Sequence, residues 1–374
     1  MRVELTRTCV LLARAGVNVE HLRAAAAASG SSPEALLAEG ARALRGIELR
    51  PSTRDALTSP DERAIDADLR WLEAAHATLV PFSSPQYPEL LAQAGSAPAV
   101  LYVLGDPAAL KEPQLAMVGS RNPTPAGRET ARDFARHFAR IGLAITSGLA
   151  LGIDGASHEG ALAGGGLTIA VCGHGLDIVY PHEHRELAAR IREHGALVSE
   201  FPPGTQPLRP NFPQRNRIIS WLSFGTLVVE AGIRSGSLNT ARYALDQGRE
   251  VFAIPGSIHN PVARGCHKLI REGAKLVEEA ADVLSELKIP LLSQRPAPPR
   301  DAPSATSAAS LAMDKDYEIL LDAVGFEPVS IDAIVERTGL PSESIASMLL
   351  ILELDGRVAP SSGGRYCRLP EQTP

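Results

Sequence analysis

The sequence predicts an α/β protein whose core is a doubly wound, mostly parallel sheet. Between about residues 100 and 289, short apolar runs of strand length alternate with amphipathic stretches of helix length. Several of the apolar runs end in glycine or serine. Such alternation indicates βαβ units, in which helices cover parallel strands on both faces. A ligand crevice is then expected at the carboxyl ends of the strands.

Residues 1–75 are expected to form a small helical domain. Apolar residues recur at helical spacing from Leu11 to Leu22. The segment Ser31–Glu34 has the residues of a helix start. A serine hydroxyl can accept a free backbone N–H, proline is tolerated at the first position, and a carboxylate suits the positive first turn.

The sheet domain is expected over residues 76–289. Its strands are predicted at Leu115–Val118, Leu143–Thr146, Thr168–Val171, Ala196–Val198, Thr226–Val229, Val251–Ile254 and Lys275–Val277. Its helices are predicted at 125–141, 155–163, 182–194, 213–222, 237–247, 264–272 and 279–287.

The C-terminal part divides into a linker and a second small domain. Residues 290–313 contain five prolines and a run rich in serine and alanine, which is typical of a linker. Residues 314–374 have apolar side chains at helical spacing, followed by a Gly-Gly turn before Tyr366. Three helices and a hairpin wing fit that pattern.

The charge of the chain is unevenly distributed. The whole sequence has 37 basic and 43 acidic residues, a net charge of −6, which alone argues against a dedicated nucleic-acid binder. Residues 201–275, however, have 10 basic and 4 acidic side chains, net +6, whereas residues 314–374 have 5 and 11, net −6. The acidic C-terminal domain therefore conceals a basic central segment.

Several function classes find no support in the sequence. The four cysteines are scattered without a C-x-x-C pair, so we expect reduced, buried thiols and no metal site. Gly173-His174-Gly175 lacks the third glycine of a dinucleotide fingerprint, and no P-loop is present, so no cofactor is expected. The scattered histidines His158, His174, His182 and His184 form no recognisable catalytic triad.

The absence of a secretory pattern and of a long apolar span predicts a cytoplasmic protein without a membrane segment. The N-terminus has Glu4 within its first residues and no apolar core followed by a cleavage site. No stretch reaches the roughly 18 uninterrupted apolar residues of a membrane helix.

The residues at the predicted strand ends are suited to phosphate. Gly119-Ser120-Arg121 follows the first strand, and Thr124-Pro125 then has the pattern of a helix start. Ser147-Gly148 ends the second strand before Asp154, the expected N-cap of its helix. Arg234 and Ser235-Gly236-Ser237 follow the strand at 226–229. Glycine permits close approach and helix N-termini favour anions, although such residues equally make tight connections between strand and helix.

The segment 207–220 concentrates basic and aromatic side chains. Arg209, Phe212, Arg215, Asn216 and Arg217 lie together where a loop is expected to enter a helix. Arginines can neutralise successive phosphates, and an exposed phenylalanine can stack on a base, a combination that binds single strands. The alternative is that Phe212 fills the core while the arginines are simply solvated.

Seven ordered segments resemble one known family. They are GSRNPTPAGRE, SGLALGIDGASHEGAL, GLDIVYPHEHREL, SEFPPGTQPLRPNFPQRNRIIS, VVEAGIRSGSLNTARYAL, GREVFAIPGSI and GCHKLIREGAKLV. Over roughly residues 70–290 the chain is similar to the DNA-processing protein A (DprA/Smf) family. The resemblance implies a helical, SAM-like N-terminal domain, an extended Rossmann-like domain and a C-terminal winged-helix-like domain.

The resemblance also implies a function without catalysis. Family members are recombination mediators that bind and protect incoming single-stranded DNA during natural transformation and load the RecA recombinase. A homodimer is expected, with Val283, Leu284 and Leu287 as a suitable apolar surface, although packing on the sheet explains these residues equally well. The candidate DNA-binding residues are Gly119, Ser120, Arg121, Ser147, Gly148, Arg209, Asn211, Phe212, Arg215, Asn216, Arg217, Arg234, Ser237 and Lys268.

Two further interpretations remain. The strand-end turns also resemble the lysine-decarboxylase-like phosphoribohydrolases, but their P-G-G is absent and Glu230 comes one residue late. A slip of one residue in a strand turns a side chain to the opposite face, which disfavours this nucleotide-binding enzyme. The acidic residues 314–374 would repel phosphate, so we expect a protein-contact or regulatory role for them rather than DNA reading.

Overall fold

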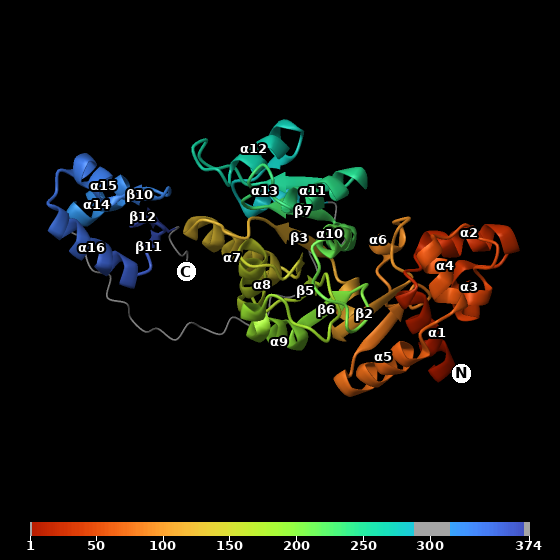
Figure 1. Cartoon of the computed structure of the whole chain (residues 1–374). Helices are drawn as coiled ribbons and strands as arrows, with labels where there is room; N and C mark the ends of the chain where they lie inside the picture. The colour runs from red at the N-terminus through yellow and green to blue at the C-terminus, as the bar shows by residue number, and fades with distance from the viewer. Residues whose placement is uncertain (1, 288–314, 370–374) are drawn as a thin grey trace.

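The computed structural model describes residues 2–287 and 315–369 (Figure 1). The predicted linker, 290–313, lies outside the described residues. The N-terminal part is helical as predicted, and its helices are α1 (Arg2–Arg14), α2 (Val19–Ser29), α3 (Pro33–Glu39), η1 (Gly40–Arg42), α4 (Pro51–Thr58) and α5 (Glu62–Ala75).

The predicted helix start in the N-terminal part is confirmed at α3. Ser32 is the N-cap, its hydroxyl accepts a hydrogen bond from the backbone N–H of Ala35, and Pro33 occupies the first helical position. Leu12, Leu22 and Leu37 are buried among these helices. The same apolar cluster includes strand side chains of the large sheet, so the helices pack directly on one end of that sheet.

Nine strands form the large sheet. Their bounds are β1 (Thr78–Pro81), β2 (Val100–Gly105), β3 (Gln114–Val118), β4 (Ala144–Ser147), β5 (Thr168–Val171), β6 (Gly195–Ser199), β7 (Gly225–Val228), β8 (Glu250–Ala253) and β9 (Lys275–Leu276). Their order in the sheet is β1-β2-β6-β5-β4-β3-β7-β8-β9. Strands β3 to β9 run parallel to one another, and β1 and β2 are antiparallel additions at one edge.

The seven predicted strands are confirmed, whereas β1 and β2 are not predicted from the sequence. β1 has only four residues and ends in a proline, a residue disfavoured in strands. No helix separates β2 from β3 in the βαβ manner, because only the 3-10 turn η2 (Pro107–Lys111) lies between them. The alternation that reveals the parallel strands is therefore missing here.

All seven predicted helices of the sheet domain are present, and they cover both faces of the sheet as expected for a doubly wound fold. They are α7 (Pro125–Arg140), α8 (Ile153–Ala163), η3 (His182–His184) with α9 (Arg185–Glu193), α10 (Asn211–Leu222), α11 (Ser237–Asp246), α12 (Arg264–Arg271) and α13 (Ala280–Glu286), besides a short α6 (Glu89–Ala92). Along β3, Leu115 and Met117 pack toward α7, α8 and α13, whereas Ala116 and Val118 pack toward α10, α11 and α12.

The C-terminal part has the predicted three helices and a hairpin. Its helices are α14 (Lys315–Val324), α15 (Ile331–Thr338) and α16 (Ser342–Leu354), and its strands are β10 (Val329–Ser330), β11 (Val358–Ser361) and β12 (Arg365–Arg368). The strands form a small antiparallel sheet in the order β10-β12-β11. Leu320, Ile334 and Leu349 form a core that includes no residue of the large sheet.

Two side predictions can be compared with the structure. The four cysteines are buried and unpaired as expected, and burial raises the pKa of Cys172 to about 12.

The apolar surface proposed for dimerisation is wrong, because Val283 and Leu287 are 0% and 8% exposed and pack under the sheet. Within the described ranges no helix is long and apolar enough to cross a membrane.

Candidate nucleic-acid interface

An open groove of about 910 Å³ lies at the carboxyl ends of β3 and β7. These strands are neighbours in the sheet, but β4, β5 and β6 separate them in the sequence and lie on the other side of β3. The strand order therefore reverses between β3 and β7. Such a switch point is where doubly wound sheets bind ligands.

The loop after β3 forms one wall of the groove. Gly119, Ser120 and Arg121 all line it, and Arg121 is exposed. Gly119 is required by close packing, since a Cβ there would lie 2.6 Å from the Ile153 side chain and 2.8 Å from the carbonyl oxygen of Glu230. The missing side chain thus lets this loop lie directly against the end of β7.

Glu230 holds the Arg121 loop in place. Its carboxylate accepts hydrogen bonds from the backbone N–H of Thr124 at 2.8 Å and from the Thr124 hydroxyl at 2.7 Å. The same hydroxyl accepts a bond from Gly127 N–H and caps α7, which confirms the predicted helix start at Thr124-Pro125. Burial raises the pKa of Glu230, and the bonds from Thr124 oppose that shift. Both carboxylate oxygens therefore have structural partners.

The loop after β7 forms the opposite wall. Arg234 is exposed and lines the groove, and Ser237 begins α11 with its hydroxyl 2.7 Å from that of Ser235. The side-chain amide of Asn216, on α10, donates to the carbonyl of Gly236 at 3.3 Å. Asn216 therefore links α10 to this loop and also lines the groove.

Phe212 lies at the centre of the groove lining, close to the start of α10. Its ring is half-buried, and its centroid is 5.9 Å from that of Tyr180. The Arg121 guanidinium lies 5.6 Å from the Phe212 centroid. Arg209, exposed in the loop before α10, completes the basic rim. Phe212 is therefore partly buried, as the core interpretation predicted, but part of its ring faces the groove, as base stacking requires.

Arg215 lies beneath the groove rather than in solvent. It is 4% exposed, and its guanidinium donates to the carbonyl of Gly148 at 2.6 Å and to that of Val171. A Cβ at Gly148 would lie 2.5 Å from this guanidinium, so the glycine makes the contact sterically possible. Ser147 is fully buried and donates to the Met117 carbonyl. Arg215 therefore forms part of the floor of the groove, whereas Ser147 and Gly148 are buried and do not line it.

Asp154 is the acidic residue of the groove lining. The sequence analysis predicted Asp154 as the N-cap of α8. This prediction is wrong, because Gly152 occupies the N-cap position. The carboxylate of Asp154 instead accepts a bond from the Gly148 backbone N–H at 3.1 Å. Burial raises the pKa of Asp154, and the charge of Arg215 opposes the shift.

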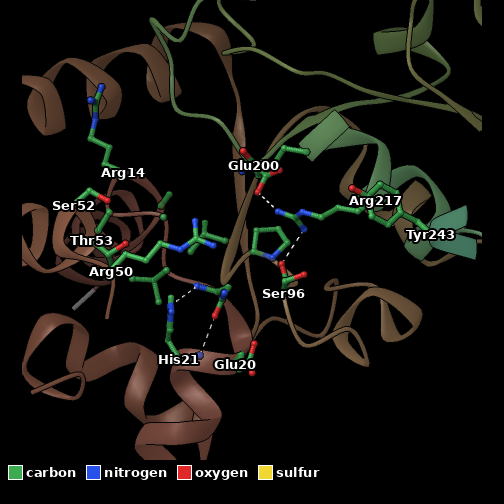
Figure 2. Close-up of a pocket in the computed structure, with 18 residues that line it drawn as sticks. Arg14, Glu20, His21, Arg50, Ser52, Thr53, Ser96, Glu200, Arg217 and Tyr243 are labelled. Carbon is green, nitrogen blue, oxygen red and sulfur yellow. Dashed lines mark hydrogen bonds and ion pairs between the residues drawn. The ribbon is translucent and has the colours of Figure 1, made fainter. Parts of the chain in front are cut away.

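Besides Ser147 and Gly148, three further candidate residues do not line the groove. Asn211 begins α10 and donates to the carbonyl of Gln206 within the preceding loop. Lys268 lies in an adjacent cavity that shares Arg234 with the groove, and its ammonium is 3.8 Å from a carboxylate oxygen of Glu272. Arg217 lines a second cavity, of about 660 Å³, between the N-terminal helices and the sheet domain (Figure 2).

The groove contains cations that no carboxylate neutralises. Within residues 2–287 and 315–369, Arg121, Arg209 and Arg234 form no ion pair, in contrast to Arg132 and Arg136 on α7. Guanidinium groups without partners, beside helix starts and an aromatic pair, can bind phosphates and stack on bases. Tyr180 is a lining residue that was not predicted from the sequence; its position after GLDIV in a conspicuous segment was the available signal.

Comparisons with known proteins agree with this architecture. A family model described as DNA recombination-mediator protein A matches residues 78–288, and a DprA winged helix domain model matches residues 295–364. Protein Smf of Escherichia coli strain K12 is 45% identical over 325 residues, 87% of this chain and 85% of the relative. DNA processing protein DprA of Bacillus subtilis is 46% identical over 56% of this chain and 70% of that protein.

Solved structures show the same likeness. The X-ray structure of DNA processing protein A from Streptococcus pneumoniae superposes with a TM-score of 0.64 at 35% identity, covering 75% of this chain and 97% of that one. A Helicobacter pylori structure, described as showing the single-stranded DNA binding mode of DNA processing protein A, has a TM-score of 0.51 at 27% identity and covers 56% of this chain and 94% of that one. The chain therefore belongs to the DprA/Smf family of DNA recombination-mediator proteins.

Proposed function

We propose that the groove between β3 and β7 binds single-stranded DNA with little sequence preference. The observation that carries this proposal is that three exposed arginines line one groove with Phe212 and Tyr180 and form no ion pair with any residue that the structure describes. Arginines bind the phosphates of any sequence, and every base has a face that can stack on an aromatic ring. The Helicobacter pylori relative, which is described as binding single-stranded DNA, supports the proposal.

A salt titration with arginine variants tests this proposal. Arg121→Ala and Arg209→Ala should each weaken single-strand binding about tenfold, the effect expected from removing a charge-assisted hydrogen bond. Each should also reduce the slope of log K against log salt by about 0.7 for every phosphate that the variant no longer neutralises. Arg128→Ala is the matched control, because Arg128 is exposed on α7 outside the groove. Equal affinity of all three variants and the original chain would contradict the proposal.

A comparison of single and double strands tests the role of the aromatic pair. Bases in a duplex are stacked on one another, so they cannot stack on Phe212 or Tyr180 without being separated. A gel-shift experiment should therefore show tighter binding of the single strand, and Phe212→Ala should reduce this preference. Equal affinity for both forms would indicate binding to the backbone alone.

We propose that the protein acts by binding rather than by catalysis. The carboxylate that would serve a phosphoribohydrolase, Glu230, is held by both donors of Thr124 and does not line the groove. Burial raises the pKa of Glu230, but both of its carboxylate oxygens are used to hold the loop that contains Thr124. Purified protein incubated with AMP should release no free adenine; release that is abolished in Glu230→Gln would support the enzyme instead.

We further propose that the protein acts as a homodimer that loads RecA on incoming single strands during natural transformation. Family membership supports the mediator role. The exposed apolar residues Ile233 and Leu276 line a cavity beside the edge strand β9, and Ile258 is 73% exposed, so this end of the sheet is suited to a second copy. Leu276→Asp should shift the sedimentation coefficient toward the monomer. RecA strand exchange, measured with and without the protein, tests the loading role.

A further inference from the structure

The adjacent cavity that contains Lys268, which we call the side cavity, is continuous with the groove. Its volume is about 510 Å³. The residues that it shares with the groove belong to the loop after β7 and the first turn of α11, and they are Arg234, Ser235, Gly236 and Asn239. The cavity that Arg217 lines shares no residue with the groove. A strand that leaves the groove past the start of α11 therefore passes directly over the side cavity.

Two neighbouring helices form the walls of the side cavity. α11 contributes Arg242, and α12 contributes Lys268. Both helices pack on β8 and lie at the same end of the sheet (Figure 1). Along α11, lining residues recur every three positions from Asn239 through Arg242 to Leu245, a spacing that keeps side chains on one side of a helix. This side of α11 begins in the groove and leads away from it.

The basic side chains of the side cavity are available to a ligand. Arg242 is exposed, and within residues 2–287 and 315–369 it forms no ion pair. The Lys268 ammonium lies 3.8 Å from a carboxylate oxygen of Glu272, one turn further along α12, and both side chains are about half exposed. An exposed pair of this kind contributes at most about 1 kcal/mol, so a phosphate can replace the carboxylate. With Arg234 at the border of the groove, three basic side chains and one acidic side chain line the cavity.

The side cavity differs from the groove in its lack of a ring for base stacking. Its apolar lining includes the exposed Ile233 and Leu245 and the buried Leu269, and none of the described residues that line it is aromatic. Basic side chains without an aromatic face contact phosphates and do not read bases. The side cavity therefore suits the backbone of a strand whose bases are held in the groove.

We propose that single-stranded DNA continues from the groove across the side cavity, where Arg242 and Lys268 neutralise phosphates of nucleotides that lie outside the groove. This inference rests on the proposed binding of single-stranded DNA in the groove, and it assigns the direction in which the strand leaves. Glu272 limits the affinity of this second contact, because its carboxylate competes with phosphate for Lys268. Short strands that remain within the groove do not reach these residues.

Oligothymidylates of two lengths, bound to the full chain, test this path. A short one of about four nucleotides stays within the groove, whereas a long one of about 20 extends beyond it. The double variant Arg242→Ala/Lys268→Ala should weaken binding of the long oligonucleotide about tenfold. It should also reduce the slope of log K against log salt by about 1.4, which is about 0.7 for each of two phosphates. Binding of the short oligonucleotide should not change, and fluorescence anisotropy at low salt measures both affinities.

Two further variants separate this role from a general loss of charge or of fold. Arg185→Ala/Arg190→Ala is the matched control, because it removes two exposed arginines of α9 that lie outside the groove and the side cavity. It should leave both affinities unchanged. Glu272→Gln releases Lys268 and should raise the affinity for the long oligonucleotide about two- to fivefold, the range expected from an exposed ion pair. A destabilised fold cannot produce this gain.

These outcomes are separable from those of the groove. Unchanged affinity of Arg242→Ala/Lys268→Ala for the long oligonucleotide, or an equal loss at both lengths, would overturn the path across the side cavity. Unchanged affinity of Glu272→Gln would overturn the assignment of Lys268. Arg121 lines the groove and not the side cavity, so Arg121→Ala should weaken both lengths. If Arg121→Ala changed neither, the groove proposal would fail, while the double variant would still report on the side cavity.

Discussion

The two arginines that lie near the Phe212 ring differ in what they can do. Arg121 is exposed and forms no ion pair within residues 2–287 and 315–369, whereas Arg215 is buried and donates to two backbone carbonyls. Both guanidiniums lie close to the same ring, at 5.6 and 5.9 Å from its centroid. The residue type is the same, but only Arg121 is free to bind a phosphate. Counting arginines in a basic segment therefore overestimates the charge available to DNA.

The largest expected effect that sharpens this contrast is on stability. Arg215→Ala should lower the free energy of unfolding by about 3–5 kcal/mol, because it leaves two buried carbonyls without their donor and removes a positive charge that favours the ionised form of the buried Asp154. Urea denaturation followed by circular dichroism measures the change. Arg121→Ala should alter stability by less than about 0.5 kcal/mol, as is usual for exposed positions. Similar destabilisation in both variants would erase the distinction between the two arginines.

The next effect concerns the ring beside them. Phe212→Ala should weaken single-strand binding by about 1–3 kcal/mol, the contribution of one base stacked on an aromatic side chain. Fluorescence anisotropy with a labelled oligonucleotide measures this change. Phe212→Tyr keeps the aromatic face and should retain most of the affinity. If the tyrosine variant were as weak as the alanine variant, Phe212 would act by packing against Gly173 and Tyr180 instead of by stacking.

The stability of the sheet domain should also depend on pH, through one buried histidine. His158 is fully buried beside the Thr168 hydroxyl at 2.6 Å, and burial lowers its pKa from 6.5 to about 3. Between these values the unfolded chain binds a proton that the folded chain does not, so stability falls as the pH falls below 6.5. From pH 7 to pH 5 this amounts to about 2 kcal/mol. His158→Gln should flatten the unfolding free energy over this range; an unchanged slope would assign the acid sensitivity elsewhere.

The smallest effect is expected from the acidic C-terminal domain. Its core is separate from the clusters that support the sheet, so a chain ending at residue 313 should keep its fold. Removing a net charge of −6 should leave single-strand affinity unchanged at physiological salt and raise it slightly at low salt, where screening is weak. Filter binding at two salt concentrations measures both. A large decrease in affinity would show that residues 314–374 contact DNA directly.

The parallel sheet was predictable because its signals are local. Alternating apolar runs and glycine- or serine-containing turns indicated the seven strands from β3 onward and the helices between them. The N-cap at Thr124 was likewise visible in the sequence. β1 and β2 were not, since their antiparallel pairing produces neither the helix alternation nor a turn signal. The predicted N-cap at Asp154 was wrong for a related reason, because its carboxylate accepts a bond from Gly148 in the preceding loop and does not cap its own helix.

The sequence by itself determined the fold class, the strand-end loops and the presence of a basic segment, because each depends on neighbouring residues. Only the tertiary structure decided which arginines are free. The Arg215 guanidinium finds its carbonyls 67 and 44 residues away, at Gly148 and Val171, and Arg217 finds Glu200 just after the end of β6. Two residues apart on one helix, these side chains enter the floor of the groove and the wall of the second cavity. The burial of each arginine and the identity of its hydrogen-bond partners depend on how distant strands and loops pack together, so no local sequence pattern predicts them.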